Sequence, residues 1–192
     1  MYEYVTFERQ YGSGGQEIAT KLSKRLGYRL YDRGVLIETC KRMNVDYAYI
    51  SKLEETAPSK LFFRAPGSEA TQEEQIFETE TVVIREAAEK PGCIFVGRCA
   101  SEILKDKKCL RVFVTADDEY RLDRAVNVEH IPADQAEGQM RKVDKRREKF
   151  FNAHSGNNWH NPEYFDIILN SGRLGVDACV DILEGVIRGA AE

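Results

Sequence analysis

The sequence predicts an α/β fold in which an open, parallel sheet is covered by helices. Short apolar runs alternate with amphipathic stretches along much of the chain, as expected when strands are followed by helices. Three of the runs are almost continuously apolar, which favours strands that are buried on both faces of a parallel sheet. In addition, a glycine-rich turn joins the first predicted strand to the first predicted helix.

The predicted elements follow one another in a regular order. They are strands at residues 2–8, 28–31, 93–96, 109–115 and 165–169, with a helix at 16–26 after the first strand and a last helix at 176–187. The helix at 16–26 is indicated by Ile18, Leu22 and Leu26, which are spaced to share one helical face. Gly27 provides its stop signal.

Two regions depart from this alternation within what the length of 192 residues predicts to be a single domain, residues 1–192. Residues of about 33–90 carry only helical and loop signals, so we expect a helical insert at one edge of the sheet. Residues of about 129–163 begin with a charged helix after Pro132 and end in a polar stretch.

Composition restricts the class of protein. The net charge of −4 argues against a protein that binds nucleic acid mainly by bulk electrostatics. The five cysteines are odd in number and show no CxxC spacing, which favours free thiols in a reduced, cytoplasmic protein. The sequence has no apolar run of the roughly 20 residues that span a membrane, and its first residues show no secretory pattern.

The glycine-rich turn predicts an anion site. Gly12, Gly14 and Gly15 lie between the first strand and the first helix, where backbone N–H groups and a helix N-terminus converge on one point. The best-fitting anion is a nucleotide phosphate. A P-loop, however, carries Lys and then Ser or Thr after its glycines, and here Gly15 and Glu17 hold those places. The turn is therefore either a degenerate P-loop or a glycine turn that binds nothing.

Residues that follow the strands suit phosphate handling, because ligands of open α/β sheets bind beyond the carboxyl ends of the strands. These positions hold Arg9 to Gly15, Asp32-Arg33, Gly97-Arg98, Thr115 to Asp118 and Asn170-Ser171. The charged helix adds a basic cluster at 141–149, and Arg121 and Arg124 add charge to the same side. Taken alone, the basic cluster would be a solvent-facing helix. Its position between the fourth and fifth strands suggests instead a solvated, mobile lid that brings arginines to a transferring phosphate.

Taken together, these residues resemble the cytidylate kinase-like family, a divergent branch of the P-loop nucleoside monophosphate kinases. The resemblance is carried by Arg9-Gln10-Tyr11-Gly12-Ser13-Gly14-Gly15, Leu30-Tyr31-Asp32, Val96-Gly97-Arg98-Cys99-Ala100, Asp144-Lys145-Arg146-Arg147 and residues 164–171. It implies the three-layer P-loop NTPase fold, with a five-stranded parallel sheet in the order 2-3-1-4-5. It also implies an acceptor-binding insert, a lid, and phosphoryl transfer from ATP to a CMP-like acceptor with Mg²⁺.

The resemblance assigns roles position by position. The ATP phosphates are assigned to the glycine loop and the start of the first helix, with Arg124 beside them. The residues of the loop and the helix start are Gly12, Ser13, Gly14, Gly15, Gln16 and Glu17. Binding of the phosphoryl acceptor is assigned to Asp32, Arg33 and Arg98, and the lid arginines are Arg146 and Arg147. The implied partners are small-molecule nucleotides, without nucleic acid or membrane.

Three positions depart from the family's pattern. Gly15 replaces the loop lysine, Glu17 replaces the Mg²⁺-linked hydroxyl, and Val96 stands where related kinases carry an Asp. The missing positive charge must come from Arg9, from the lid pair Arg146 and Arg147, or from a metal ion alone. We predict that Arg9 supplies it, the alternative for this residue being that it pairs with Glu17 and only shapes the loop. Glu17 either ligates Mg²⁺ or lies in the first helical turn because its negative charge interacts favourably with the helix dipole.

Two functions remain open from the sequence. The first is an ATP-dependent kinase of a nucleoside monophosphate or a similar small acceptor. The second is a non-catalytic nucleotide-binding or regulatory module that has lost the lysine. The arginines Arg98, Arg146 and Arg147 favour the kinase, because a pure binding module has no need of lid arginines.

Overall fold

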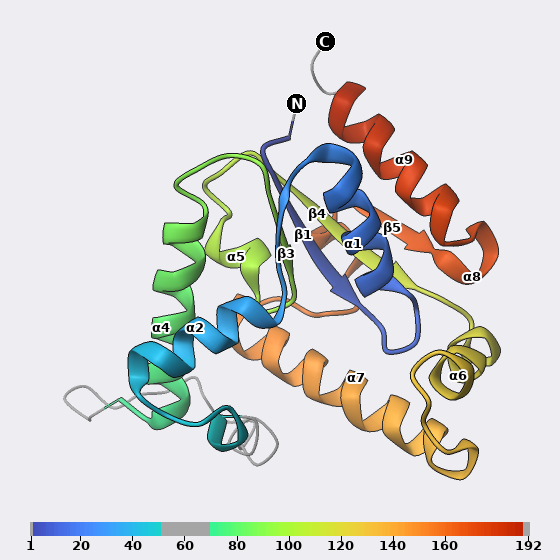
Figure 1. Cartoon of the computed structure of the whole chain (residues 1–192), viewed down its shortest axis with the longest axis horizontal. Helices are drawn as coiled ribbons and strands as arrows, with labels where there is room; N and C mark the ends of the chain where they lie inside the picture. Colours follow the sequence, from blue (N-terminus) through green and yellow to red (C-terminus); the bar gives the residue numbers. More distant parts are fainter. Residues whose placement is uncertain (1, 51–69, 190–192) are drawn as a thin grey trace.

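A computed structural model describes residues 2–50 and 70–189 of the chain. Its centre is a five-stranded parallel sheet in the order β2-β3-β1-β4-β5, which confirms the predicted P-loop topology (Figure 1). The strands are β1 (Tyr4–Arg9), β2 (Arg29–Tyr31), β3 (Cys93–Val96), β4 (Cys109–Thr115) and β5 (Ile167–Asn170). Phe7 of β1 pairs with Val96 of β3 on one side and Val112 of β4 on the other.

The helices follow the strands in the predicted alternation. They are α1 (Gly15–Leu26), α2 (Arg33–Met43), α4 (Gln72–Ala87), α5 (Ala100–Ile103), α6 (Asp118–Asn127), α7 (Ala133–Ser155), α8 (Ser171–Leu174) and α9 (Val176–Gly189), with a 3₁₀ turn at Pro162–Tyr164. No helix within residues 2–50 and 70–189 has the length and apolar character needed to cross a membrane. All five cysteines are free, and four of them are buried.

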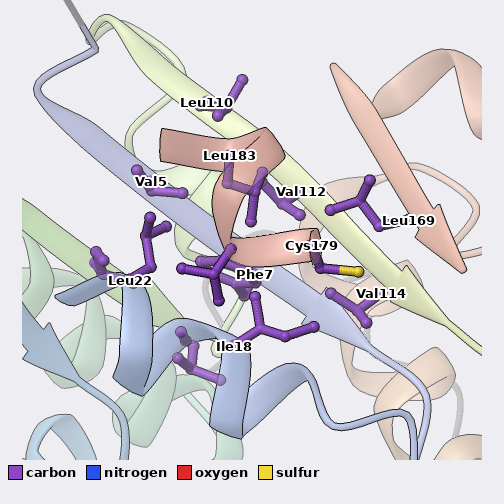
Figure 2. Close-up of a cluster of buried hydrophobic side chains, with 14 of the residues drawn as sticks. Val5, Phe7, Ile18, Leu22, Leu110, Val112, Val114, Leu169, Cys179 and Leu183 are labelled. Carbon is purple, nitrogen blue, oxygen red and sulfur yellow. The ribbon is translucent and has the colours of Figure 1, made fainter. Parts of the chain in front are cut away.

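The main core lies between the sheet and the pair α1 and α9 (Figure 2). Val5 and Phe7 of β1 meet Ile18 and Leu22 of α1 there, and Leu183 of α9 packs beside them. Side chains alternate along a strand, so Tyr4, Thr6 and Glu8 of β1 point to the other face of the sheet. This second face is covered by a cluster of α4 and α5 residues and by an aromatic cluster that includes Phe151 and Trp159.

The prediction that the last strand is buried on both faces is wrong. The strand begins at Ile167 rather than at residue 165, and Phe165 packs into the aromatic cluster just before it. Ile168 is 43% exposed. The physical reason is the alternation of side chains along the strand: Ile167 and Leu169 pack in the main core, whereas Ile168 points to the opposite face.

The region predicted as a helical insert holds α2 and α4, which pack against each other. Leu36 and Cys40 of α2 contact Ile76 of α4 in a small core of their own, and Arg42 forms a two-pronged ion pair with Glu86. Residues 51–69 of the predicted insert lie outside the described residues.

The predicted charged helix is α7, a helix of 23 residues that lies below the arrowhead of β1 in Figure 1. Ala136, Met140, Val143 and Phe151 form a buried stripe along it. The expectation of a solvated lid is therefore wrong for this face of α7, because the apolar stripe holds the helix against the body of the protein.

His154 of α7 predicts a pH dependence of stability. Its ring stacks on Phe77 of α4 with 3.7 Å between centroids. Burial lowers the pKa of His154 to about 4, and the charge of Arg98 acts in the same direction. Because the unfolded imidazole titrates near 6.5, the unfolded chain binds the proton more readily. Stability should therefore fall as the pH drops from 6.5 towards 4, by on the order of 2 kcal/mol at pH 5.

Denaturant unfolding at pH 7 and pH 5 measures this loss. His154→Phe keeps an aromatic ring without a titrating nitrogen, so its loss of stability between the two pH values should be smaller than that of the wild type. His160→Phe, at an exposed position, is the matched control and should behave as the wild type does. Equal losses in the wild type and His154→Phe would contradict the prediction.

Candidate active site

The glycine loop, residues 10–14, connects the carboxyl end of β1 to the first turn of α1. Gly12 and Gly14 adopt positive φ angles of 74° and 72°, a left-handed conformation that glycine takes without strain. A Cβ atom at Gly12 would also lie 2.5 Å from the carbonyl oxygen of Arg121. The close approach of α6 therefore requires glycine at position 12.

Hydrogen bonds tie this loop to the ends of the neighbouring strands. The Ser13 hydroxyl donates to the carbonyl of Gln10 at 2.8 Å, and the Ser171 hydroxyl donates to the carbonyl of Ser13. The side chain of Gln10 in turn accepts from the hydroxyl of Thr115 at the end of β4. The first N–H groups of a helix have no acceptor within the helix, so the start of α1 is disposed to bind an anion.

Arg9 occupies the space that a side chain at position 15 would need. A Cβ atom at Gly15 would lie 2.7 Å from the Cβ atom of Arg9 and 3.0 Å from its Cγ atom. At its other end, Nη1 of Arg9 would be 2.6 Å from a Cβ atom at Gly97, directly after β3. The side chain of Arg9 thus runs from the start of α1 to the end of β3, and it excludes a lysine at position 15 in this backbone.

The structure brings together four of the predicted arginines: Arg9, Arg98, Arg146 and Arg147. Burial lowers the pKa of Arg9, with Glu8 and Asp32 opposing the shift and Arg98 and Arg146 adding to it. Burial also lowers the pKa of Arg147 to about 9, and the charge of Arg9 contributes. Desolvated positive charges that crowd one another favour the binding of an anion between them.

Glu8 is a member of this group that the sequence analysis missed. Its carboxylate is buried on the second face of the sheet and accepts a hydrogen bond from Nε1 of Trp159 at 3.2 Å. Burial raises the pKa of Glu8, and the neighbouring charge of Arg9 opposes the rise. The signal was present in the sequence, because a charged residue inside an apolar strand is uncommon unless it has a partner.

The predicted acceptor residues are only partly brought together. Asp32 precedes α2 close enough to act electrostatically on Arg9, whereas Arg33 is exposed on the first turn of α2. Arg98 has a positive φ of 58° and forms an ion pair with Glu80 of α4 at 3.1 Å. Glu80 is fully buried and was also missed, because its partner depends on how α4 packs.

Glu17 pairs with cations other than Arg9. Its carboxylate accepts from Arg124 at 2.8 Å and from Lys21 at 3.0 Å, so the alternative of an Arg9–Glu17 pair is wrong. Burial raises the pKa of Glu17, but the hydrogen bonds from Lys21 and Arg124 outweigh it and leave the pKa below its usual value. Counting along the motif also places Gln16, which is exposed, directly after the lysine position, one residue before Glu17.

The residues at this site do not fit a metal ion held by Glu17. Both of its neighbours are cations, which compete for the carboxylate oxygens that Mg²⁺ would need. In the described part of the chain, no group of three or more His, Cys, Asp or Glu side chains could hold a metal ion.

Comparison with known proteins agrees with this geometry. A model of the cytidylate kinase-like family matches residues 4–173, which is most of the chain. The chain belongs to the cytidylate kinase-like family. The cytidylate kinase of Thermoplasma acidophilum is 24% identical over 170 residues, covering 87% of this chain and 82% of that protein. The cytidylate kinase of Sulfolobus acidocaldarius is 25% identical over 177 residues, covering 92% and 89%.

Solved structures support the fold of the family. An uncharacterized protein from Eubacterium ventriosum superposes with a TM-score of 0.72 at 24% identity, covering 96% of this chain and 98% of that one. Shikimate kinase from Acinetobacter baumannii, solved with shikimate, gives a TM-score of 0.59 at 15% identity, covering 99% and 95%. Similarity at these identities concerns the fold, and the acceptor of this family member must be argued from its own residues.

Proposed function

We propose that this protein transfers a phosphoryl group from ATP to a nucleoside monophosphate of the cytidylate type. The observation that carries the proposal is the path of Arg9, which fills the space of the P-loop lysine and ends beside Gly97. A cation is thereby present between the glycine loop and the end of β3. The low-identity cytidylate kinase relatives support the choice of acceptor.

Each group of residues has a role in this proposal. The N–H groups at the start of α1 bind the phosphates of the donor, and Arg124 lies beside Gly14 to add charge on that side. Arg98 binds the acceptor phosphate, and Asp32 lies on the acceptor side, close enough to act electrostatically on Arg9. Arg9, Arg146 and Arg147 stabilise charge on the transferring group, because phosphoryl transfer depends mainly on positioning and on positive charge around the phosphoryl oxygens.

A coupled assay of ADP release tests the proposal. With ATP and Mg²⁺ supplied, CMP should stimulate ADP release more than UMP, cytidine or shikimate does. A protein that binds ADP by calorimetry but releases no ADP with any acceptor would instead be the non-catalytic nucleotide-binding module. A protein that binds neither ADP nor ATP would overturn both functions.

A further inference from the structure

Two residues of α7 hold the backbone of the chain that enters the glycine loop. The N–H group of Tyr11 donates to Oδ1 of Asp144 at 2.7 Å. One helical turn later, Nη1 of Arg147 donates to the carbonyl oxygen of Arg9 at 3.0 Å. The central part of α7 is thus hydrogen-bonded to two backbone groups at the point where β1 passes into the glycine loop.

Arg121 of α6 closes this arrangement from the other side. Its side chain is almost fully buried, and its Nε donates to the carbonyl oxygen of Tyr11 at 2.8 Å. A second nitrogen of the same guanidinium pairs with Asp144. Both the N–H and the C=O group of Tyr11 are therefore held, and the two side chains that hold them are bound to each other.

This arrangement determines the direction of the next residues of the loop. The backbone of Gly12 follows Tyr11 directly and packs on the carbonyl group of Arg121, which leaves no space for a Cβ atom. Fixing the Tyr11 peptide groups therefore limits the rotations by which the following N–H groups could turn away from an anion. Donors that are fixed in advance bind charge without the cost of reorganisation.

We propose that Asp144 is a positioning residue that joins α7 to the glycine loop and pre-forms the loop for the phosphates of the nucleotide. The inference rests on the proposed function, since it takes the loop to be the phosphate site. It also implies that the central turn of α7 stays with the loop when nucleotide binds, so that any lid movement is confined to other parts of residues 129–163.

Calorimetric titration with ADP tests this role without requiring turnover. Asp144→Ala removes both the charge and the acceptor and should weaken ADP binding on the order of tenfold, because ordering the loop then costs part of the binding free energy. Asp144→Asn keeps an acceptor oxygen for Tyr11 and should lie between Asp144→Ala and the wild type. Glu137→Gln removes a carboxylate from the exposed face of the same helix and should bind ADP as the wild type does.

Hydrogen exchange at the Tyr11 amide reports the contact itself. In the nucleotide-free protein it should speed up in Asp144→Ala and stay unchanged in Glu137→Gln. If Asp144→Ala does not fold, Asp144→Asn answers the same question through its ADP affinity. Failure of the wild type to bind ADP would overturn the proposed function, whereas wild-type ADP affinity and wild-type exchange in folded Asp144 variants would overturn the role of Asp144 alone.

Discussion

Replacing Arg9 by alanine is expected to lower turnover about 10²–10³-fold, as is common when one preorganised group that stabilises transition-state charge is removed. ATP binding should weaken much less, because the loop N–H groups and Arg124 remain. The physical reason is the position of Arg9, whose guanidinium lies beside Gly97 while its stem fills the space of the missing lysine side chain. Steady-state kinetics with ATP and CMP would measure kcat and KM separately.

Two further variants make the Arg9 test specific. Arg9→Lys keeps a positive charge on a flexible side chain and should recover part of the turnover. If Arg9 only shapes the loop through its planar guanidinium, the Arg9→Lys variant should be as inactive as Arg9→Ala. Arg25→Ala removes an arginine at the far end of α1, where it pairs with Asp181 in solvent, and should leave turnover unchanged. Full turnover of Arg9→Ala in an active preparation would refute the assignment of Arg9.

Restoring the P-loop lysine by Gly15→Lys is expected to harm the protein. Its Cβ atom would lie 2.7 Å from the Cβ atom of Arg9, and two atoms fixed so closely to the backbone cannot separate by a change of rotamer. Overpacking of this kind costs about 1–3 kcal/mol, or about 2–4 °C in Tm for each kcal/mol in a protein of this size. The turnover of Gly15→Lys should fall together with its Tm, because either Arg9 or the start of α1 must move.

The double variant Arg9→Gly with Gly15→Lys separates crowding from chemistry. Removing the Cβ atom of Arg9 removes the closest contact of a side chain at position 15, although a Cβ atom there still lies 3.3 Å from that of Val114. Tm should therefore recover part of the loss, and a cation should again reach the loop. Gly138→Lys is the control, since Gly138 is an exposed position of α7 with nothing within 4 Å of a Cβ atom. A Gly15→Lys protein with wild-type Tm and higher turnover would contradict our account of why position 15 is glycine.

The sequence determined the architecture of this protein because that information is local. The alternation of apolar strands with helical stretches predicts the parallel sheet, and the run from Arg9 to Gly15 predicts the turn after β1. A positive φ angle, as at Gly12 and Gly14, is a requirement of a single residue, so the presence of glycine in the sequence indicates it directly. The resemblance to a known family then predicted the strand order and the candidate arginines.

Only the tertiary structure decided which charges meet. Tyr11 and Asp144 are 133 residues apart, and Glu8 and Trp159 are 151 apart, so no local pattern could pair them. The same holds for Glu17. From the sequence its partner could be Arg9, Mg²⁺ or the helix dipole, whereas in the fold it is paired with Arg124 and Lys21. Even Arg9 and Gly15, six positions apart, meet only because the glycine loop turns the chain back upon β1, and this contact leaves no space for a side chain at position 15.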